Sequence, residues 1–444
     1  MSQRMNVPNC TGVRRWRWRA AIGLALALAA GCRRAPSSTG APPSPDTATT
    51  ATATADGGAL PPSRTAFHAN TFEKVPTVKD LTATGRTLFF APELSASGKL
   101  ACASCHDPAF AFGPPNDRAV QLGGAGGALA GSRAAPSLRY LQTVPRFDPH
   151  YQDSDGDGTD QGPAGGYTWD GRAETTHEQA QLPLFSPLEM ANGSPETLIA
   201  RLRSSRHAPE LRATFGDHVL DTTASGLKAV LMALEVFQQS STEFYPYDSQ
   251  YDAYLRGQAT LDARATRGLH LFNDPRKGNC ASCHPSQVKN NGAFPQFTDY
   301  GFVALGVPRN RALRANADAG YFDLGLCGPL RTDLKARKEY CGMFRTPSLR
   351  NVTVKRRFFH NGVMSSLKDV LRFYVTRDRQ PERWFPRGPG GKVQRFDDLP
   401  AQYHANVNVD PPFGRAGRRP ALSESELDDL VAFLDTLKDG YRPR

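Results

Sequence analysis

The sequence predicts a mostly α-helical protein made of two tandem copies of one domain, with little strand and long loops. The word Cys-Ala-Ser-Cys-His occurs twice, at residues 102–106 and at residues 280–284. Each copy follows a Gly-x-x-Leu-Phe-x-x-Pro word, at residues 85–92 and 268–275. Because these words recur in the same order, they indicate an internal duplication.

Local signals predict the individual helices. The two Gly-x-x-Leu-Phe words favour short amphipathic helices that end before Pro92 and Pro275, since proline cannot continue a helix. A helix-like run covers residues 224–239. Ser423 and Glu426 form a capping box that begins a last helix. Its apolar positions form one stripe: Leu427, Leu430, Val431, Leu434 and Leu437.

The repeated five-residue word is typical of covalent attachment of a c-type haem. Two thiols bond to the porphyrin, and the adjoining histidine becomes the proximal iron ligand. A zinc site would not need a histidine directly after each cysteine pair, and a thioredoxin-like site needs a βαβ pattern that is not visible here. The sequence therefore predicts two covalently bound haem c groups. Their expected ligands are Cys102, Cys105 and His106 in the first copy, and Cys280, Cys283 and His284 in the second.

Two segments precede the predicted domains. Residues 1–31 have an arginine-rich start and a short apolar run, which is the pattern of a signal peptide. The run ends in Leu-Ala-Ala-Gly before Cys32, which resembles a bacterial lipobox. Cleavage at another small residue is the alternative. Residues 32–66 are rich in Ala, Pro and Thr and predict a disordered tether, because they cannot bury enough apolar surface to fold.

We therefore expect cytochrome-c-like haem domains at residues 67–250 and 251–444. The protein would be periplasmic, and its only contact with a membrane would be a lipid anchor on Cys32. The net charge of +11 includes five arginines of the leader. The positive charge that remains without the leader is small, and the sequence has no stripe of aromatic and basic residues. A nucleic-acid partner is therefore not indicated.

The motifs together resemble the bacterial di-haem cytochrome c peroxidase and MauG family, over roughly residues 67–440. In that family one haem reacts with hydrogen peroxide and the other stores or relays electrons. Besides the haem words, the matching words are Leu88-Phe89-Phe90, Trp169-Asp170-Gly171-Arg172, Glu178-Gln179-Ala180, Pro187-Leu188-Glu189-Met190, Arg345-Thr346-Pro347-Ser348-Leu349-Arg350-Asn351 and Phe359-His360-Asn361-Gly362.

The resemblance implies catalytic roles for three side chains. Trp169 occupies the position of a tryptophan that lies between the two haems. Glu189 matches a distal carboxylate, which can carry a proton from one peroxide oxygen to the other. Gln179 matches a residue that positions peroxide or water. The alternatives are a core position for Trp169 and a helix-terminal charge for Glu189.

The repeat also aligns two positions above the predicted haems. Twelve residues after Gly171 stands Pro183, and twelve residues after Gly362 stands Tyr374. Because proline has no side-chain donor atom, we expect the first iron to keep an open sixth position. Typical peroxidases of the family close this haem with a histidine shortly after the first haem word, whereas residues 121–127 contain none.

We expect His284 and Tyr374 to be the axial ligands of the second iron. Ordinary peroxidases of the family have a methionine at this position, and MauG-type proteins have a tyrosine. Met343 and Met364 are rival ligands, but both precede the matching position. The structural alternative is that Tyr374 only packs in a helix core.

Two further sites follow from the remaining residues. Cys327 and Cys341 predict a disulfide, since leftover cysteine pairs usually bridge in an oxidising compartment. Calcium stays open, because the family's calcium-ligand positions are Ala134, Lys355 and Arg357 here. A loop with aspartates at positions 153, 155 and 157 resembles the start of a calcium loop, but its twelfth residue is Ala164.

The predicted function is therefore reduction of hydrogen peroxide at an open first haem. Electrons would come through the second haem from a small periplasmic c-type cytochrome or a cupredoxin. The alternative is MauG-like long-range oxidation of an unknown protein substrate through a high-valent di-haem state. Simple electron transfer is a third possibility, which an open first haem with Glu189 disfavours.

Overall fold

The computed structural model describes residues 69–152, 159–414 and 420–443. These residues belong to one compact unit, Pro61–Arg444. The predicted signal peptide, the tether with Cys32 and the aspartate-rich loop at 153–158 lie outside the described residues. Within the described ranges, no helix is long and apolar enough to cross a lipid bilayer.

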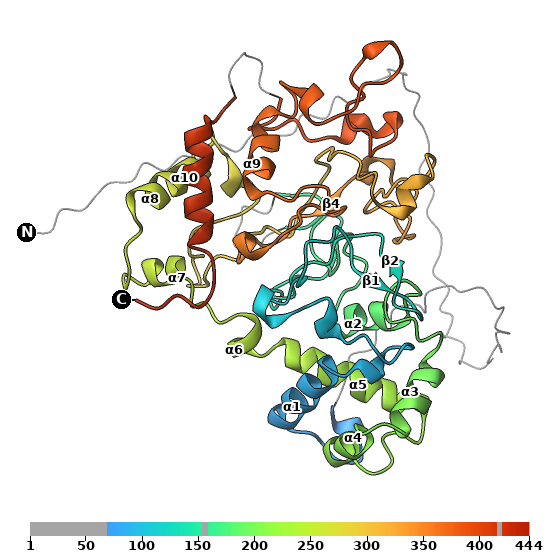
Figure 1. The fold of residues 1–444 in the computed structure, drawn as a ribbon. Coiled ribbons are helices and arrows are strands. Elements are labelled where there is room, and N and C mark those ends of the chain that lie inside the picture. Colours follow the sequence, from blue (N-terminus) through green and yellow to red (C-terminus); the bar gives the residue numbers. More distant parts are fainter. Residues whose placement is uncertain (1–68, 153–158, 415–419, 444) are drawn as a thin grey trace, which may run out of the picture. The chain divides into compact units, whose positions relative to one another are not determined.

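The described part of the chain is mostly helical with little sheet, as predicted (Figure 1). Two antiparallel pairs of short strands are present, β1 (Leu122–Gly123) with β2 (Leu129–Ala130) and β3 (Phe302–Val303) with β4 (Phe344–Arg345). The α-helices are α1 (Val78–Phe89), α2 (Thr176–Phe185), α3 (Pro195–Arg203), α4 (Ala208–Phe215), α5 (Thr223–Gln238), α6 (Ser241–Phe244), α7 (Gln250–Leu255), α8 (Ala263–Asn273), α9 (Leu367–Thr376) and α10 (Glu424–Asp435).

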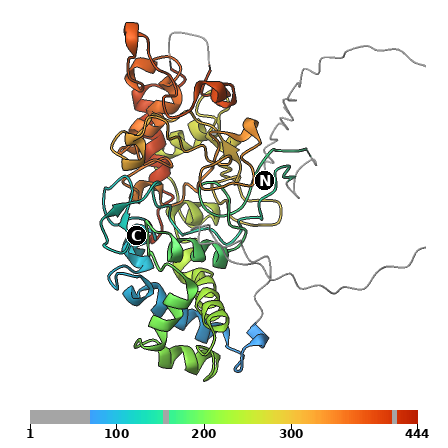
Figure 2. The ribbon, with the colours of Figure 1, turned by 90° about the vertical axis from the view of Figure 1, so that its right-hand side faces the viewer.

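The buried apolar side chains form two main clusters that share no residue. The first cluster lies within residues 69–245 and includes the inner faces of α1 and α5. The second lies within residues 251–437 and includes those of α8 and α10. In each half, the helix before the haem word packs along a later helix: α1 on α5, and α8 on α10 (Figures 1 and 2).

The sequence signals for these helices are confirmed. The helices before the two haem words, α1 and α8, end at Phe89 and Asn273, just before Pro92 and Pro275. The helix-like run at 224–239 is α5. The last helix begins at a capping box in which Ser423 and Glu426 bond each other's backbone N–H groups. Of its apolar stripe only Val431 is half-buried, and the other four members are buried.

The repeated glycine explains the close helix packing in both halves. A Cβ atom added to Gly85 would lie 1.9 Å from the carbonyl oxygen of Ala233 in α5. One added to Gly268 would lie 2.1 Å from the carbonyl oxygen of Asp429 in α10. Since both neighbours are backbone atoms within helices, they cannot move aside without shifting the helix.

We therefore expect Gly268→Ala to lower the free energy of unfolding by about 1–3 kcal/mol, the usual cost of overpacking. Gly85→Ala should have a similar effect, because its contact is equivalent. Chemical denaturation of the holoprotein measures both. Gly126→Ala is the matched control, because a Cβ there meets no heavy atom within 4 Å. Equal stability of the Gly268→Ala and Gly126→Ala proteins would contradict the packing argument.

The turns after the haem words are also repeated. In the first half, an antiparallel bridge joins Tyr167 to Ala173 around the turn at Gly171. In the second half, Phe358 is bridged to Met364 around Gly362. The two glycines have φ angles of 63° and 62°, a left-handed conformation that glycine adopts at little cost. The aligned words thus form the same local structure twice.

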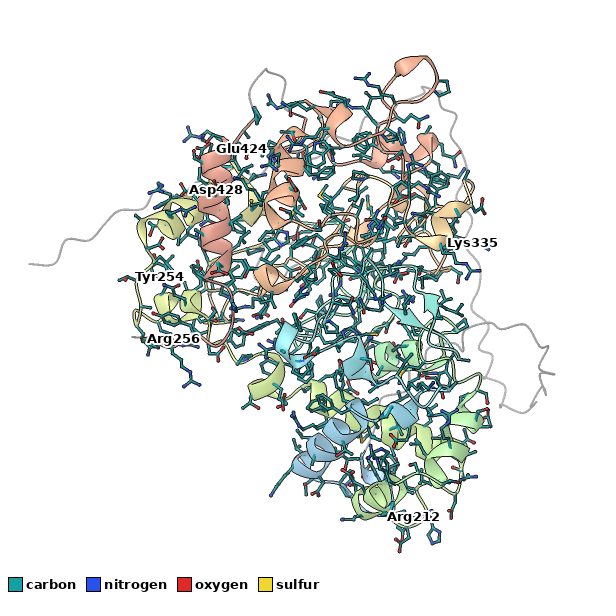
Figure 3. The ribbon with its side chains drawn as sticks, in the orientation of Figure 1. Arg212, Tyr254, Arg256, Lys335, Glu424 and Asp428 are labelled. Carbon is teal, nitrogen blue, oxygen red and sulfur yellow. A yellow bond between two sulfur atoms is a disulfide. The ribbon has the colours of Figure 1, made fainter. Side chains whose placement is uncertain are left out.

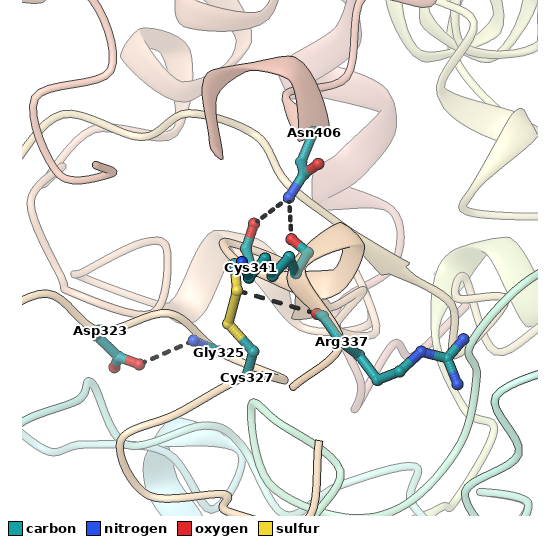
Figure 4. Close-up of a disulfide and its surroundings, with 7 residues drawn as sticks. Asp323, Gly325, Cys327, Arg337, Cys341 and Asn406 are labelled. Atoms are coloured by element: carbon teal, nitrogen blue, oxygen red, sulfur yellow. Dashed lines mark hydrogen bonds between the residues drawn. A yellow bond between two sulfur atoms is a disulfide. The ribbon is translucent and has the colours of Figure 1, made fainter. Parts of the chain in front are cut away.

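A disulfide joins Cys327 to Cys341, whose Cα atoms are 5.0 Å apart (Figure 4). The Asn406 amide donates hydrogen bonds to the carbonyl oxygens of Lys338, at 2.8 Å, and Cys341, at 3.0 Å. On the other side, the backbone N–H of Gly325 donates to the Asp323 carboxylate. The bridged loop therefore borders an acidic side chain that contacts the first half, as described below.

Candidate haem-binding active site

The two predicted proximal histidines are held in the same way. The Nδ1–H of His106 donates to the carbonyl oxygen of Phe112 at 3.0 Å, and that of His284 donates to the carbonyl oxygen of Phe297 at 2.7 Å. Each histidine backbone N–H also bonds the carbonyl oxygen of the first cysteine of its word, at 2.9 Å in both halves. Each imidazole is therefore fixed in position beside its cysteines.

This arrangement fits iron ligation. Burial lowers the pKa of His106 and of His284 to about 4, so that both rings are neutral at neutral pH. With Nδ1 donating its proton to a carbonyl, the Nε2 lone pair is free to bind a metal. The four cysteines of the two words are not in disulfides. The residues present therefore suit two c-type haems, which the family also implies.

Phe112 and Phe297 were missed by sequence reasoning. They stand six and thirteen residues after their histidines, so simple spacing does not align them. The later Pro-Ser-Leu-Arg words show that Phe112 and Phe297 are equivalent positions. Ser137 donates to the carbonyl oxygen of the residue before Phe112, and Ser348 donates to that of the residue before Phe297. The serine in each word thus supports the loop whose carbonyl orients the histidine.

Glu189 lies close to the first haem word. Burial raises the pKa of the Cys105 thiol to about 11, and the negative charge of Glu189 adds to the rise. Burial among protein atoms raises the pKa of Glu189 itself. Ser186 and Arg172 act in the opposite direction. Glu189 is nevertheless an exposed residue, so its side chain contacts solvent as well as protein. Such a group is suited to taking up and releasing protons.

The backbone of Glu189 is fixed by the loop in which family members place a histidine. Its carbonyl oxygen accepts a 2.7 Å hydrogen bond from the N–H of Gly124. A Cβ atom at Gly123 would lie 2.2 Å from the carbonyl oxygen of Leu188. The glycines after β1 therefore let this loop lie directly against the segment that carries the carboxylate.

Gln179 and Pro183 both lie on α2, half-buried and one turn apart. Pro183 is the eighth residue of this ten-residue helix, and Tyr374 is the eighth residue of the ten-residue helix α9. The carbonyl oxygen of Pro183 accepts a hydrogen bond from the N–H of Met190 at 3.0 Å, which links α2 to the segment of Glu189. The structure thus brings Gln179, Pro183 and Glu189 into one region.

Tyr374 lies in the second apolar cluster, stacked on Phe413 with ring centroids 5.0 Å apart. Burial raises the pKa of its phenol, and the thiols of Cys283 and Cys280 raise it further. Arg377 acts in the opposite direction. The electrostatic interaction with both cysteines indicates that the phenol lies near the second haem word.

Trp169 joins the two halves. Its indole Nε1–H donates to the carbonyl oxygen of Ala134 at 2.7 Å, and the N–H of Ala134 donates to the carbonyl oxygen of His360 at 2.7 Å. The carbonyl oxygen of Trp169 accepts from the N–H of Arg345 at 2.9 Å. The indole is therefore held by the first half, and the backbone of Trp169 is bonded to the second half.

Buried charges hold the turn next to Trp169. Arg133 donates to Asp170 at 2.7 Å and binds both carboxylate oxygens of Asp323 at 2.6 and 2.7 Å. Arg172 also donates to the Asp170 carboxylate at 2.8 Å, and Arg331 donates to the backbone carbonyl oxygen of Asp170 at 2.9 Å. Burial would raise the pKa of the Asp170 carboxyl, but Arg133 and Arg172 outweigh it and hold that pKa well below its usual range. Sequence reasoning missed this network, because no local pattern pairs residue 133 with residue 323.

A second buried acid lies beside the His360 turn. Asp398 accepts hydrogen bonds from Arg309 at 3.0 Å and from Asn361 at 2.9 Å. His360 Nε2 lies 3.9 Å away, and its ring stacks on Phe344. Burial raises the pKa of Asp398 to about 7, and the charges of Asp323 and Asp397 add to the rise. Arg309 and the Asn361 bond oppose it.

This shift predicts a pH effect on stability. Because the pKa of Asp398 is higher in the folded state than in the unfolded chain, the folded protein binds more protons between about pH 4 and about pH 7. Stability from this group is therefore full below that window and is lost as the pH rises through it. Asp398→Asn should remove this loss, so that the free energy of unfolding of the variant rises relative to that of the wild type between about pH 4 and about pH 7. Denaturation curves across this range measure it, with the exposed Asp435→Asn as the control. A pH-independent difference would contradict the prediction.

The positions considered for calcium do come together. Ala134, Lys355 and Arg357 line one small cavity of about 10 Å³, with Asn116 and Arg118 at its wall. Burial lowers the pKa of Lys355 to about 8. Within the described ranges, no group of three or more His, Cys, Asp or Glu side chains could hold a metal ion. The sequence left calcium open at this position, and it stays open.

Comparisons with known proteins agree with this geometry. The family model described as di-haem cytochrome c peroxidase matches residues 79–260. The methylamine utilization protein MauG of Paracoccus denitrificans is 32% identical over 384 residues, covering 84% of this chain and 93% of that protein. The cytochrome c peroxidase Ccp of Escherichia coli is 27% identical over 372 residues, covering 84% of this chain and 61% of that protein.

Solved structures give the same result. The crystal structure of the di-haem peroxidase BthA from Burkholderia thailandensis has a TM-score of 0.71 and 38% identity, over 86% of this chain and 89% of that chain. A MauG-like protein associated with microbial copper homeostasis has a TM-score of 0.58 and 25% identity, over 86% and 93% of the two chains. The chain therefore belongs to the di-haem cytochrome c peroxidase and MauG family and is an oxidoreductase of this type.

Proposed function

We propose that this protein reduces hydrogen peroxide at the site around Cys102, Cys105 and His106. Electrons would enter through the second haem site from a small periplasmic c-type cytochrome or a cupredoxin. The observation that carries this proposal is the position of Glu189, whose segment is hydrogen-bonded to Gly124 and to Pro183 of α2 and whose carboxylate lies close enough to Cys105 to interact with its thiol.

Reduction of one hydrogen peroxide to two waters consumes two electrons and two protons. The bound haem would supply the redox centre at which the O–O bond is cleaved. Glu189 would take a proton from one peroxide oxygen and return it to the other. Its raised pKa brings the carboxyl closer to the operating pH, which makes both transfers easier. The Gln179 amide, on the neighbouring helix, can orient peroxide or water through hydrogen bonds.

Pro183 supports an accessible peroxide site. It stands at the helix position that Tyr374 occupies in the second half, and it offers no atom that could bind iron. On this assignment the first site is ready to accept peroxide without moving a ligand. An electron paramagnetic resonance spectrum of the ferric protein that shows only low-spin haem would contradict it.

The second candidate function is MauG-like oxidation of a protein substrate, and Tyr374 is the observation that favours it. A phenolate is a stronger donor than a thioether and stabilises the more oxidised states of iron. A second site with His284 and Tyr374 would therefore hold oxidising equivalents for longer and accept electrons less readily from a donor.

Stopped-flow spectroscopy with hydrogen peroxide, with and without a reduced small cytochrome c, distinguishes the two functions. Rapid return to the resting spectrum together with oxidation of the cytochrome supports the peroxidase. A long-lived oxidised spectrum that the cytochrome does not discharge supports the MauG-like function. A spectrum that does not respond to peroxide at all would overturn both.

We also propose that the protein is periplasmic and carries a lipid on Cys32. The lipobox-like end of the leader supports this proposal. Mass spectrometry of the mature protein tests it, and an unmodified N-terminus at a residue other than Cys32 would refute it.

A further inference from the structure

A pair of stacked tyrosines leads from the second haem word to the surface. Tyr251 and Tyr254 lie one turn apart on α7, with ring centroids 5.8 Å apart and planes 29° apart. Tyr251 is 3% exposed, whereas Tyr254 is 39% exposed. Tyr254 lies at the outer edge of α7, near Arg256 (Figure 3).

The buried end of the pair touches both sides of the His284 segment. The Tyr251 hydroxyl donates to the carbonyl oxygen of Ser286 at 2.9 Å. Its ring packs edge-on against Phe297 at 5.5 Å, and the carbonyl oxygen of Phe297 accepts the Nδ1–H of His284. Since electron transfer through protein weakens steeply with distance, this short series of contacts is a favourable route between the second haem site and solvent.

We propose that Tyr254 is the surface terminus of a redox relay, reached from the second haem site through Tyr251. This inference rests on the proposed reaction with hydrogen peroxide. When no electron donor is present, oxidising equivalents from peroxide would leave the protein through Tyr254. When a donor is present, the same pair offers a route for electrons to enter.

The surroundings of the two phenols explain why oxidation would end at Tyr254. Removing an electron from a tyrosine also releases its phenolic proton, which needs an acceptor. The Tyr251 hydroxyl donates its hydrogen bond to a backbone carbonyl, which is no base, and burial raises the pKa of Tyr251 to about 12. The exposed ring of Tyr254 can reach water, which takes the proton. Oxidation of Tyr251 is therefore only transient, and the oxidation ends at Tyr254.

The step balances with hydrogen peroxide as the oxidant. Two Tyr254 side chains, from two copies of the protein, each lose one electron and one proton. One hydrogen peroxide takes up the two electrons and two protons and becomes two waters. The two phenoxyl radicals then couple through a new carbon–carbon bond, which gives a dityrosine that links the copies.

The test treats the full holoprotein with stoichiometric hydrogen peroxide in the absence of a donor. Dityrosine fluorescence and peptide mapping by mass spectrometry locate the modification, and the consumption of peroxide is recorded separately. We expect cross-linked dimers joined at Tyr254, which Tyr254→Phe abolishes. Tyr403→Phe is the matched control, because Tyr403 is a half-buried tyrosine in a different segment, Ala401–Asn406. Excess ascorbate should suppress the cross-link.

Tyr251→Phe separates a relay from simple surface reactivity. This variant keeps the ring that packs under Tyr254 but removes the redox-active phenol. The relay predicts loss of most cross-linking with unchanged consumption of peroxide. Normal cross-linking in this variant would overturn the relay, as would modification at the half-buried Trp384 in place of Tyr254. If the wild type does not consume peroxide, the proposed function is refuted, and so is the relay that depends on it.

Discussion

Replacing Glu189 with glutamine should lower kcat/KM for hydrogen peroxide by about 10²–10⁴-fold, the usual contribution of a general acid–base group. The amide has the shape of the carboxyl but cannot take up and return a proton. The backbone contacts of residue 189 with Gly124 and the surrounding loop should survive the change. Steady-state reduction of peroxide by a reduced small cytochrome measures the effect.

Two controls keep this result interpretable. The ferric spectrum of the Glu189→Gln protein should show both haems attached, which excludes loss of cofactor as the cause. Glu196→Gln, an exposed change in the first turn of α3, should leave kcat/KM unchanged. A Glu189→Gln protein with wild-type kcat/KM would show that another group moves the proton.

Replacing Tyr374 with methionine should raise the reduction potential of the second haem. The expected rise is a sizeable part of the roughly 0.8 V over which axial ligands set haem potentials. A neutral thioether favours ferrous iron, whereas a phenolate favours ferric and higher states. Redox titration followed by optical spectroscopy measures the potential. The oxidised state formed with peroxide should also decay faster in this variant.

Tyr374→Phe is the matched control for ligation. It keeps a ring that can stack on Phe413 but removes the oxygen. If Tyr374 binds iron, this variant should lose the spectrum of a six-coordinate second haem. If Tyr374 only packs, the spectrum and the potential of both variants should stay close to those of the wild type, and the MauG-like function would lose its main support.

Much of the fold was predictable because its signals are local. The prolines that end α1 and α8 and the capping box of α10 act within a few residues of sequence. The repeated words predicted equivalent positions, and the structure places Pro183 and Tyr374 at the same position of equal helices. The glycine contacts of Gly85 and Gly268 follow the same repeat.

The contacts that join distant segments were not predictable from the sequence. Arg133 binds Asp323, which is 190 positions away in the sequence, and no local sequence pattern around either residue predicts the pair. The carbonyl groups that orient the histidines come from loops of different length in the two halves. A single sequence shows which side chains can form hydrogen bonds, but only the folded chain shows which backbone carbonyl faces them.

The equal position of Pro183 and Tyr374 has a consequence for how the two halves could diverge. After a duplication, both copies start with the same helix, the same histidine support and the same left-handed turn. A single codon at the eighth helical residue can then decide whether an iron is left open or receives a second ligand. The two copies could then take different roles, one binding peroxide and one transferring electrons, without any rearrangement of the fold. Natural or engineered descendants could exchange these roles between the two halves through very few substitutions.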